Sequence, residues 1–110
     1  MHITMVKKIL ADGSACKKCA EVLAKMEAEH QLQYINEILV ADERDTQSAG
    51  MLLAAKLGID RAPFFVVRQE DGIEHVYTVY LKFVKEVLAA QVSEQDELKE
   101  IIATQNLDFL

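Results

Sequence analysis

The chain is poor in the residues that mark many specialised classes of protein. Its 110 residues include no tryptophan, one proline, four glycines and two cysteines. Two cysteines are too few for a disulfide framework or a four-cysteine zinc site. The low proline and glycine content excludes collagen-like and low-complexity chains. With 51% hydrophobic and 27% charged residues, the composition is instead typical of a folded globular domain.

Excess basic charge and long apolar runs are absent as well. Lys and Arg number 12 against 18 Asp and Glu, which gives a formal charge of -6, so a nucleic acid would meet net repulsion. The longest apolar run, residues 62–67, is far shorter than the roughly 20 residues that span a bilayer. The first residues lack the pattern of a secretory signal. We therefore expect a cytoplasmic protein that binds neither nucleic acid nor membranes, in surroundings that keep thiols reduced.

The pattern of apolar residues predicts one domain, residues 1–110, that alternates strands and helices. Short apolar and β-branched runs indicate strands, and apolar residues at three- and four-residue spacing indicate helices. Gly58 has the place of a helix C-cap, and Asp71-Gly72 is a strong hairpin signal. Strands are predicted at residues 3–10, 34–40, 64–67 and 73–79, and helices at residues 14–30, 46–57 and 81–90.

This order, β-α-β-α-β-β-α, predicts an α/β fold. Its four-stranded mixed sheet would have a parallel first half, a hairpin in the second half and helices on both faces. The apolar pattern of residues 91–110 predicts an additional helical segment, with Ser93 and Asp96 as a capping box near its start. The apolar residues of this segment can pack on the domain or form a homodimer through the C-terminal helix, and the sequence leaves both open.

The two cysteines form the motif Cys16-Lys17-Lys18-Cys19 at the start of the first predicted helix. A helix N-terminus favours thiolate over thiol, so Cys16 is the expected nucleophile, with a pKa below the usual value of about 8.5. Cys19 lies one turn further along the same helix face and is the expected resolving thiol. The charges of Lys17 and Lys18 would stabilise a neighbouring thiolate, although either lysine can equally be a solvated surface residue.

Three functions are open to such a cysteine pair. Its place between a strand and a helix favours thiol–disulfide exchange. A non-catalytic interaction module could instead use the pair as a redox-sensing disulfide that alters partner binding. A dimer could also hold a metal ion or an iron–sulfur cluster with one pair from each chain. Since His2, His30 and His75 are scattered along the chain, no metal site is expected within one chain.

The cysteine motif, the segment Leu57–Val67 and the pair Asp71-Gly72 together resemble the thioredoxin-like family over about residues 3–90. The resemblance implies a thioredoxin-like fold and a thiol–disulfide oxidoreductase that acts in cell redox homeostasis through a redox-active disulfide, without a cofactor. It also implies that the peptide bond from Ala62 to Pro63 is cis and faces Cys16. The alternative is a trans proline at the start of a strand.

The resemblance further implies how a substrate would bind. The backbone of Ala62 would pair with an extended substrate segment, and Arg61 would stand near it, unless Arg61 is a solvated loop residue. The partners would be a disulfide-containing protein substrate and a protein reductase or dithiol donor.

The chain departs from the family at several positions. Ala15 stands where thioredoxins usually have tryptophan, and Lys17-Lys18 replace Gly-Pro, which leaves the substrate range open. The first strand lacks the buried acid of thioredoxins, and Asp12 lies in the turn that follows. Residues 73–77 also lack the Gly-Gly and acid that glutaredoxins use for glutathione, so a protein partner is favoured over glutathione as the reductant.

Overall fold

The computed structural model describes residues 1–89, and the chain divides after Tyr80 into two units. The first unit holds four strands, two helices and a short 3₁₀ turn at Leu32–Tyr34. α3 (Tyr80–Phe83) begins at the last residue of the first unit and continues into a π-helical turn at Val84–Leu88. The predicted helical segment at 91–110 lies outside the described residues. The elements of the first unit are β1 (His2–Ile9), α1 (Lys17–Ala28), β2 (Glu37–Asp42), α2 (Ala49–Leu57), β3 (Phe64–Arg68) and β4 (Glu74–Tyr77).

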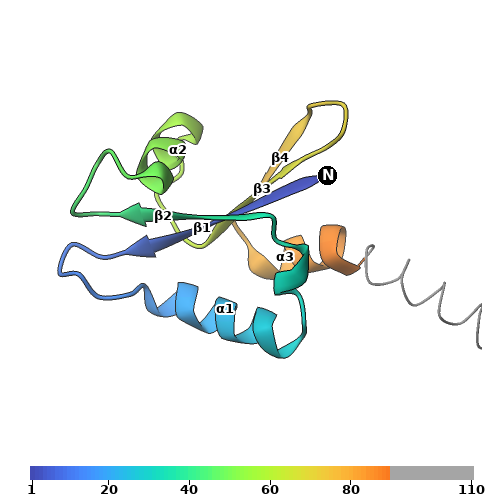
Figure 1. The fold of residues 1–110 in the computed structure, drawn as a ribbon, viewed down its shortest axis with the longest axis horizontal. Coiled ribbons are helices and arrows are strands. Elements are labelled where there is room, and N and C mark those ends of the chain that lie inside the picture. The colour runs from blue at the N-terminus through green and yellow to red at the C-terminus, as the bar shows by residue number, and fades with distance from the viewer. Residues whose placement is uncertain (90–110) are drawn as a thin grey trace, which may run out of the picture. The chain divides into compact units, whose positions relative to one another are not determined.

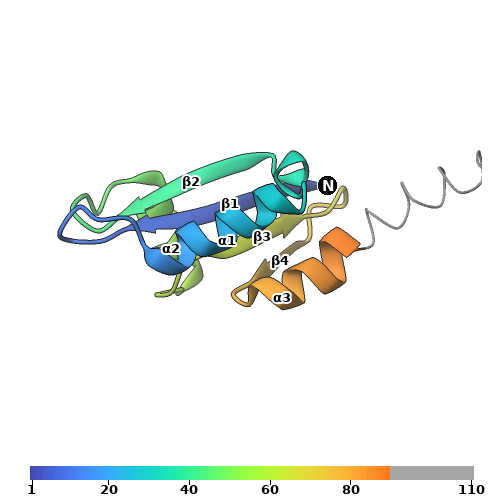
Figure 2. The same cartoon turned by 90° about the horizontal axis from the view of Figure 1, so that it is seen from below.

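The four strands form one mixed sheet in the order β2-β1-β3-β4 (Figures 1 and 2). β1 runs parallel to β2, with Val6 opposite Leu39. β3 runs antiparallel to β1, with Phe64 opposite Val6, and β4 runs antiparallel to β3. The parallel first half and the hairpin in the second half are therefore confirmed.

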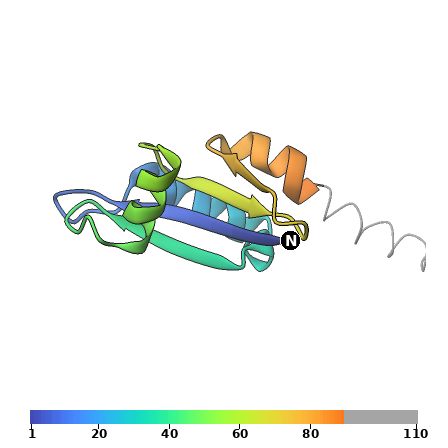
Figure 3. The same ribbon diagram turned by 90° about the horizontal axis from the view of Figure 1, so that it is seen from above.

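The sheet carries helices on both faces, because α1 and α2 lie on opposite sides of it (Figures 1 and 3). Alternate residues of a strand point to opposite faces of the sheet. On the α2 face, Val6 packs in a buried cluster with Phe64 and Val66, and α2 covers this cluster. Met5 and Phe65 occupy the alternate positions and are also fully buried. The apolar run at the start of β3 is thus a strand buried on both faces, as the sequence predicts.

Two glycines occupy the cap and turn positions that the sequence predicts. Gly58 caps α2 with a φ of 68°, and Gly72 turns the β3–β4 hairpin with a φ of 88°. Both values lie in the left-handed region, which side chains with a Cβ rarely adopt. The hairpin turn is closed by a hydrogen bond from the Gly72 N–H to the carbonyl of Gln69 at 2.9 Å.

The second strand and the second helix both begin later than predicted. β2 starts at Glu37 rather than at residue 34. The preceding Asn36 exchanges two hydrogen bonds with the Ile3 backbone, of 2.7 and 2.9 Å, one of them through its side chain. Ser48, rather than Thr46, is the N-cap of α2. The Ser48 hydroxyl accepts the Asp42 N–H at 3.0 Å and so fixes the turn between β2 and α2.

Gly50 brings the start of α2 unusually close to β2. A Cβ on Gly50 would lie 2.3 Å from the backbone nitrogen of Ala41 and 2.4 Å from the carbonyl carbon of Val40. Both are backbone atoms, which cannot move aside as a flexible side chain can. The absence of a side chain at Gly50 therefore allows the start of α2 to lie this close to β2.

Candidate functional site

Cys16 occupies the N-cap of α1, at a point where the chain has doubled back along the end of β1. An antiparallel bridge joins Ile9 to Ala15, and the Cys16 N–H donates to the Lys8 carbonyl at 3.2 Å. The Cys16 Sγ accepts the Cys19 N–H at 3.4 Å, which is the bond that a capping side chain makes in the first turn of a helix. The Cys16 side chain is half-buried, so this sulfur is both held and accessible.

The Cys16 thiolate is stabilised by its position. Burial alone would raise the pKa of Cys16, but hydrogen bonds from the Cys19 N–H, the Cys19 thiol and the Lys18 N–H outweigh it, together with the charge of Lys8. The pKa of Cys16 therefore lies below its ordinary value. This agrees with the direction expected for a thiol at a helix N-terminus.

Cys19 has the opposite environment. Its side chain is 3% exposed, and its Sγ accepts the Lys8 backbone N–H at 3.4 Å. Burial raises the pKa of Cys19 to about 11, with a further contribution from the neighbouring Cys16. The two thiols of the motif are therefore distinct, since Cys16 is half-buried with a lowered pKa while Cys19 is buried with a raised pKa.

Lys8, which the sequence analysis did not single out, is the residue that joins the parts of this site. Its backbone carbonyl binds the N–H of Cys16, and its backbone N–H binds the sulfur of Cys19. Lys8 lies two residues beyond Val6, whose partner on β3 is Phe64, so the same register would place Ala62 opposite Lys8. The cysteine segment makes the Lys8 backbone bonds that a continued β3 would otherwise make.

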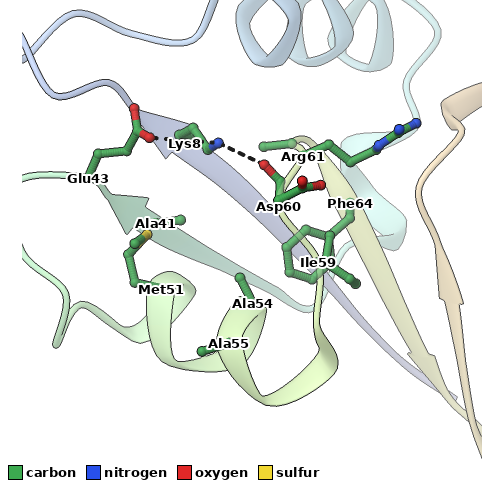
Figure 4. Close-up of a pocket in the computed structure, with 11 residues that line it drawn as sticks. Lys8, Ala41, Glu43, Met51, Ala54, Ala55, Ile59, Asp60, Arg61 and Phe64 are labelled. Atoms are coloured by element: carbon green, nitrogen blue, oxygen red, sulfur yellow. Dashed lines mark hydrogen bonds and ion pairs between the residues drawn. The ribbon is translucent and has the colours of Figure 1, made fainter.

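The Lys8 side chain reaches the loop before β3. Its Nζ donates to the carbonyl oxygen of Asp60 at 3.1 Å and lies 4.0 Å from the carboxylate of Glu43 (Figure 4). The alternation of residues along β1 is the sequence signal that could have identified Lys8. Thr4 and Val6 are buried at alternate positions of β1, and Lys8 continues the face that Val6 presents to α2, where a lysine is unusual.

The other residues singled out from the sequence lie at two places. Lys17 and Lys18 are exposed in the first turn of α1, and the ammonium group that lowers the pKa of Cys16 belongs to Lys8. Arg61, Ala62 and Pro63 lead into β3, and the Ala62–Pro63 bond is cis, as the resemblance implies. The Arg61 guanidinium points away from Lys8 and α2 (Figure 4). The substrate-binding roles of these residues, and the orientation of the cis peptide toward Cys16, stay predictions.

Among residues 1–89, no three His, Cys, Asp or Glu side chains are grouped so that they could hold a metal ion. In the same part of the chain, no helix has the length and apolar character needed to cross a bilayer.

Comparisons of the chain with protein-family models, curated proteins and solved structures found no significant match. The observations on the fold and the cysteine pair are therefore the basis for a functional assignment.

Proposed function

We propose that the chain is a thiol–disulfide oxidoreductase of the thioredoxin-like family, with Cys16 as the nucleophile and Cys19 as the resolving thiol. The observation that carries this proposal is the asymmetry of the pair. The Cys16 sulfur is accessible and accepts the Cys19 N–H at the helix N-cap, whereas Cys19 is 3% exposed on the next turn. Exchange needs one thiol that meets the substrate and one that acts only afterwards.

The reaction follows from these two positions. The Cys16 thiolate attacks one sulfur of a substrate disulfide, so a Cys16–substrate bond forms, the substrate disulfide breaks and the leaving thiolate takes a proton. Cys19 then loses its proton and attacks the Cys16 sulfur. This step forms the Cys16–Cys19 disulfide and releases the second substrate thiol. In total, two electrons pass from the cysteine pair to the substrate, and the two substrate thiolates take up two protons, one released by Cys19 and one from water.

Lys8 would assist both steps. Its ammonium group stabilises thiolate at either cysteine, because it lowers the pKa of Cys16 and opposes the effect of burial on Cys19. Its backbone holds the two residues in place through hydrogen bonds to the Cys16 N–H and the Cys19 sulfur. Lys17 and Lys18 would contribute at longer range from the exposed first turn of α1.

The proposed partners are a disulfide-containing protein and a dithiol donor. The substrate segment would lie along the backbone of Ala62, with Arg61 and Pro63 beside it. A protein reductase or another dithiol would return the Cys16–Cys19 disulfide to its reduced form. In the cytoplasm, where thiols are kept reduced, this cycle would contribute to cell redox homeostasis.

The test is the thiol–disulfide equilibrium of the purified protein in buffers of defined redox potential. Alkylation of free thiols followed by mass measurement counts the reduced cysteines at each potential. We expect a reversible two-electron transition in the native chain and none in Cys16→Ser or Cys19→Ser. Failure of the two cysteines to pair in oxidising buffer would overturn the proposal. A disulfide that forms readily but does not turn over with disulfide substrates would favour the redox-sensing module, and zinc or iron in the fresh protein would favour the metal-binding dimer.

A further inference from the structure

A cavity of about 280 Å³ lies between α2, the ends of β1 and β2 and the loop that precedes β3 (Figure 4). Most of its wall is apolar and comes from both helix and strand. The cavity does not enter the chemistry proposed above. Its apolar lining includes Met51, Ala54, Ala55, Ile59 and Phe64.

The cavity adjoins the cysteine pair through Lys8. The Lys8 side chain lines the cavity, while the Lys8 backbone binds both Cys16 and Cys19. Ala62, which the β3 register would place opposite Lys8, also lines it. The cavity and the two thiols are therefore linked through a single residue of β1, which lines the cavity with its side chain and holds the cysteines with its backbone.

The Lys8 side chain, one of the charged groups that line the cavity, already has partners there. The Lys8 ammonium group donates to the Asp60 carbonyl at 3.1 Å and lies 4.0 Å from the Glu43 carboxylate. Asp60 and Arg61 also line the cavity, so two acidic and two basic side chains leave its lining without net charge. Because pockets for drug-sized ligands measure about 300–1,000 Å³, a cavity of about 280 Å³ suits a single large side chain better than a whole cofactor.

We infer that this cavity receives an apolar side chain of the substrate polypeptide, from a residue close to the half-cystine that Cys16 attacks. The inference rests on the proposed function and names its substrate class: disulfides in peptides or proteins with a large aliphatic residue nearby in sequence. Lys8 connects the two parts of this surface, since its side chain lines the cavity and its backbone binds both cysteines, and the register of β3 would place Ala62 beside it.

The experiment is a single-turnover reduction of synthetic peptide disulfides by the reduced protein, followed by the appearance of peptide thiol. The peptides carry either Leu or the near-isosteric Asn, one or two residues before or after the half-cystine. We expect the second-order rate constant for the Leu peptide to be about tenfold higher or more at one of these positions, in line with the burial of an aliphatic side chain. Equal rates for Leu and Asn at all four positions would overturn the inference.

Two variants of α2 locate the preference. Ala55 is exposed at the wall of the cavity, so Ala55→Met should fill the opening, and Ala55→Asp should place a charge there. Both should reduce the Leu-to-Asn rate ratio to about one. Ala49→Met, on the same helix but outside the cavity, should keep the ratio of the native chain. A ratio that survives both Ala55 variants would overturn the inference.

The two proposals fail in different ways. If the peptides are reduced but show no preference, or a preference that the Ala55 variants leave intact, the oxidoreductase stands and the cavity assignment fails. If no peptide is reduced, the proposed function and the inference both fail. The ratio compares two peptides with the same protein sample, so a partly unfolded variant lowers both rates without changing it.

Discussion

The difference between the two thiols leads to a quantitative prediction for their alkylation. With a pKa of about 11, roughly one Cys19 in a thousand is thiolate at pH 8. Cys16 has a pKa below 9.0, so at least about one in eleven is thiolate at the same pH. Because only the thiolate reacts, ionisation alone predicts that Cys16 is alkylated at least about 90 times faster. The 3% exposure of Cys19 should increase the ratio further.

The assay uses Cys16→Ser and Cys19→Ser, which each leave one thiol, with a small alkylating reagent between pH 6 and 11. Burial is the largest cause of the raised pKa of Cys19, so it persists in Cys16→Ser. The backbone N–H of residue 19 still reaches the Cys16 sulfur in Cys19→Ser. We expect the Cys16 rate to level off below pH 9, and the Cys19 rate to rise about tenfold per pH unit toward pH 11.

Two results would refute this reasoning. The first is alkylation of both thiols at similar rates at pH 8. The second is a pair of pH profiles with the same midpoint near 9.0, which would mean that the N-cap position and burial do not separate the two pKa values. A urea-unfolded sample provides the reference, because both cysteines should then react alike.

Three other predictions concern Lys8, Gly50 and Cys19. Lys8→Met removes the charge that lowers the pKa of Cys16, so alkylation of Cys16 at pH 7 should become slower. The control Lys7→Met should react at the rate of the native chain. Equal alkylation rates in the two variants would contradict the role of Lys8. In urea denaturation, Gly50→Ala should lower the free energy of unfolding by about 2–3 kcal/mol, because the added Cβ clashes with β2. Gly58→Ala should lower it by only about 1 kcal/mol, because this position has a positive φ but open space around it. A larger loss in Gly58→Ala than in Gly50→Ala would count against the close approach of α2 to β2. The pKa of Cys19 is about 11 in the folded state and about 9.0 in the unfolded state, so the unfolded state loses this proton first as the pH rises. The free energy of unfolding should therefore be unaffected by Cys19 below pH 9 and should fall by about 2 kcal/mol by pH 11. Urea titrations across this pH range should show that Cys19→Ala lacks this decrease.

Much of the fold could be predicted because the relevant signals are local. Gly58 caps α2 and Gly72 lies in the hairpin turn, as the sequence predicts, since the positive φ values there favour glycine. The apolar run that begins at Phe64 predicted a central strand because its residues are buried on both faces. The sequence predicts Cys16 at the start of a helix, and it is the N-cap of α1.

The rest depends on contacts between distant parts of the chain. The choice of Ser48 over Thr46 as N-cap follows from the bond that Ser48 makes to Asp42 at the end of β2. Glycine has a low helix propensity, so the sequence alone gives no reason for Gly50 inside α2. The reason is the contact with the β2 backbone, which leaves no room for a Cβ. Lys8 is 52 positions from Asp60 in sequence, and only the assembled sheet brings the two together.

The most direct test of the central claim is to trap the intermediate between Cys16 and a substrate. Cys19→Ser, mixed with an excess of a peptide disulfide, should accumulate one peptide on Cys16, seen as a mass increase that a reducing agent reverses. Cys16→Ser should accumulate no such adduct under the same conditions, because the remaining thiol is buried and protonated. An adduct that forms equally fast in Cys16→Ser, or no adduct in Cys19→Ser, would contradict the assignment of Cys16 as nucleophile and Cys19 as resolving thiol.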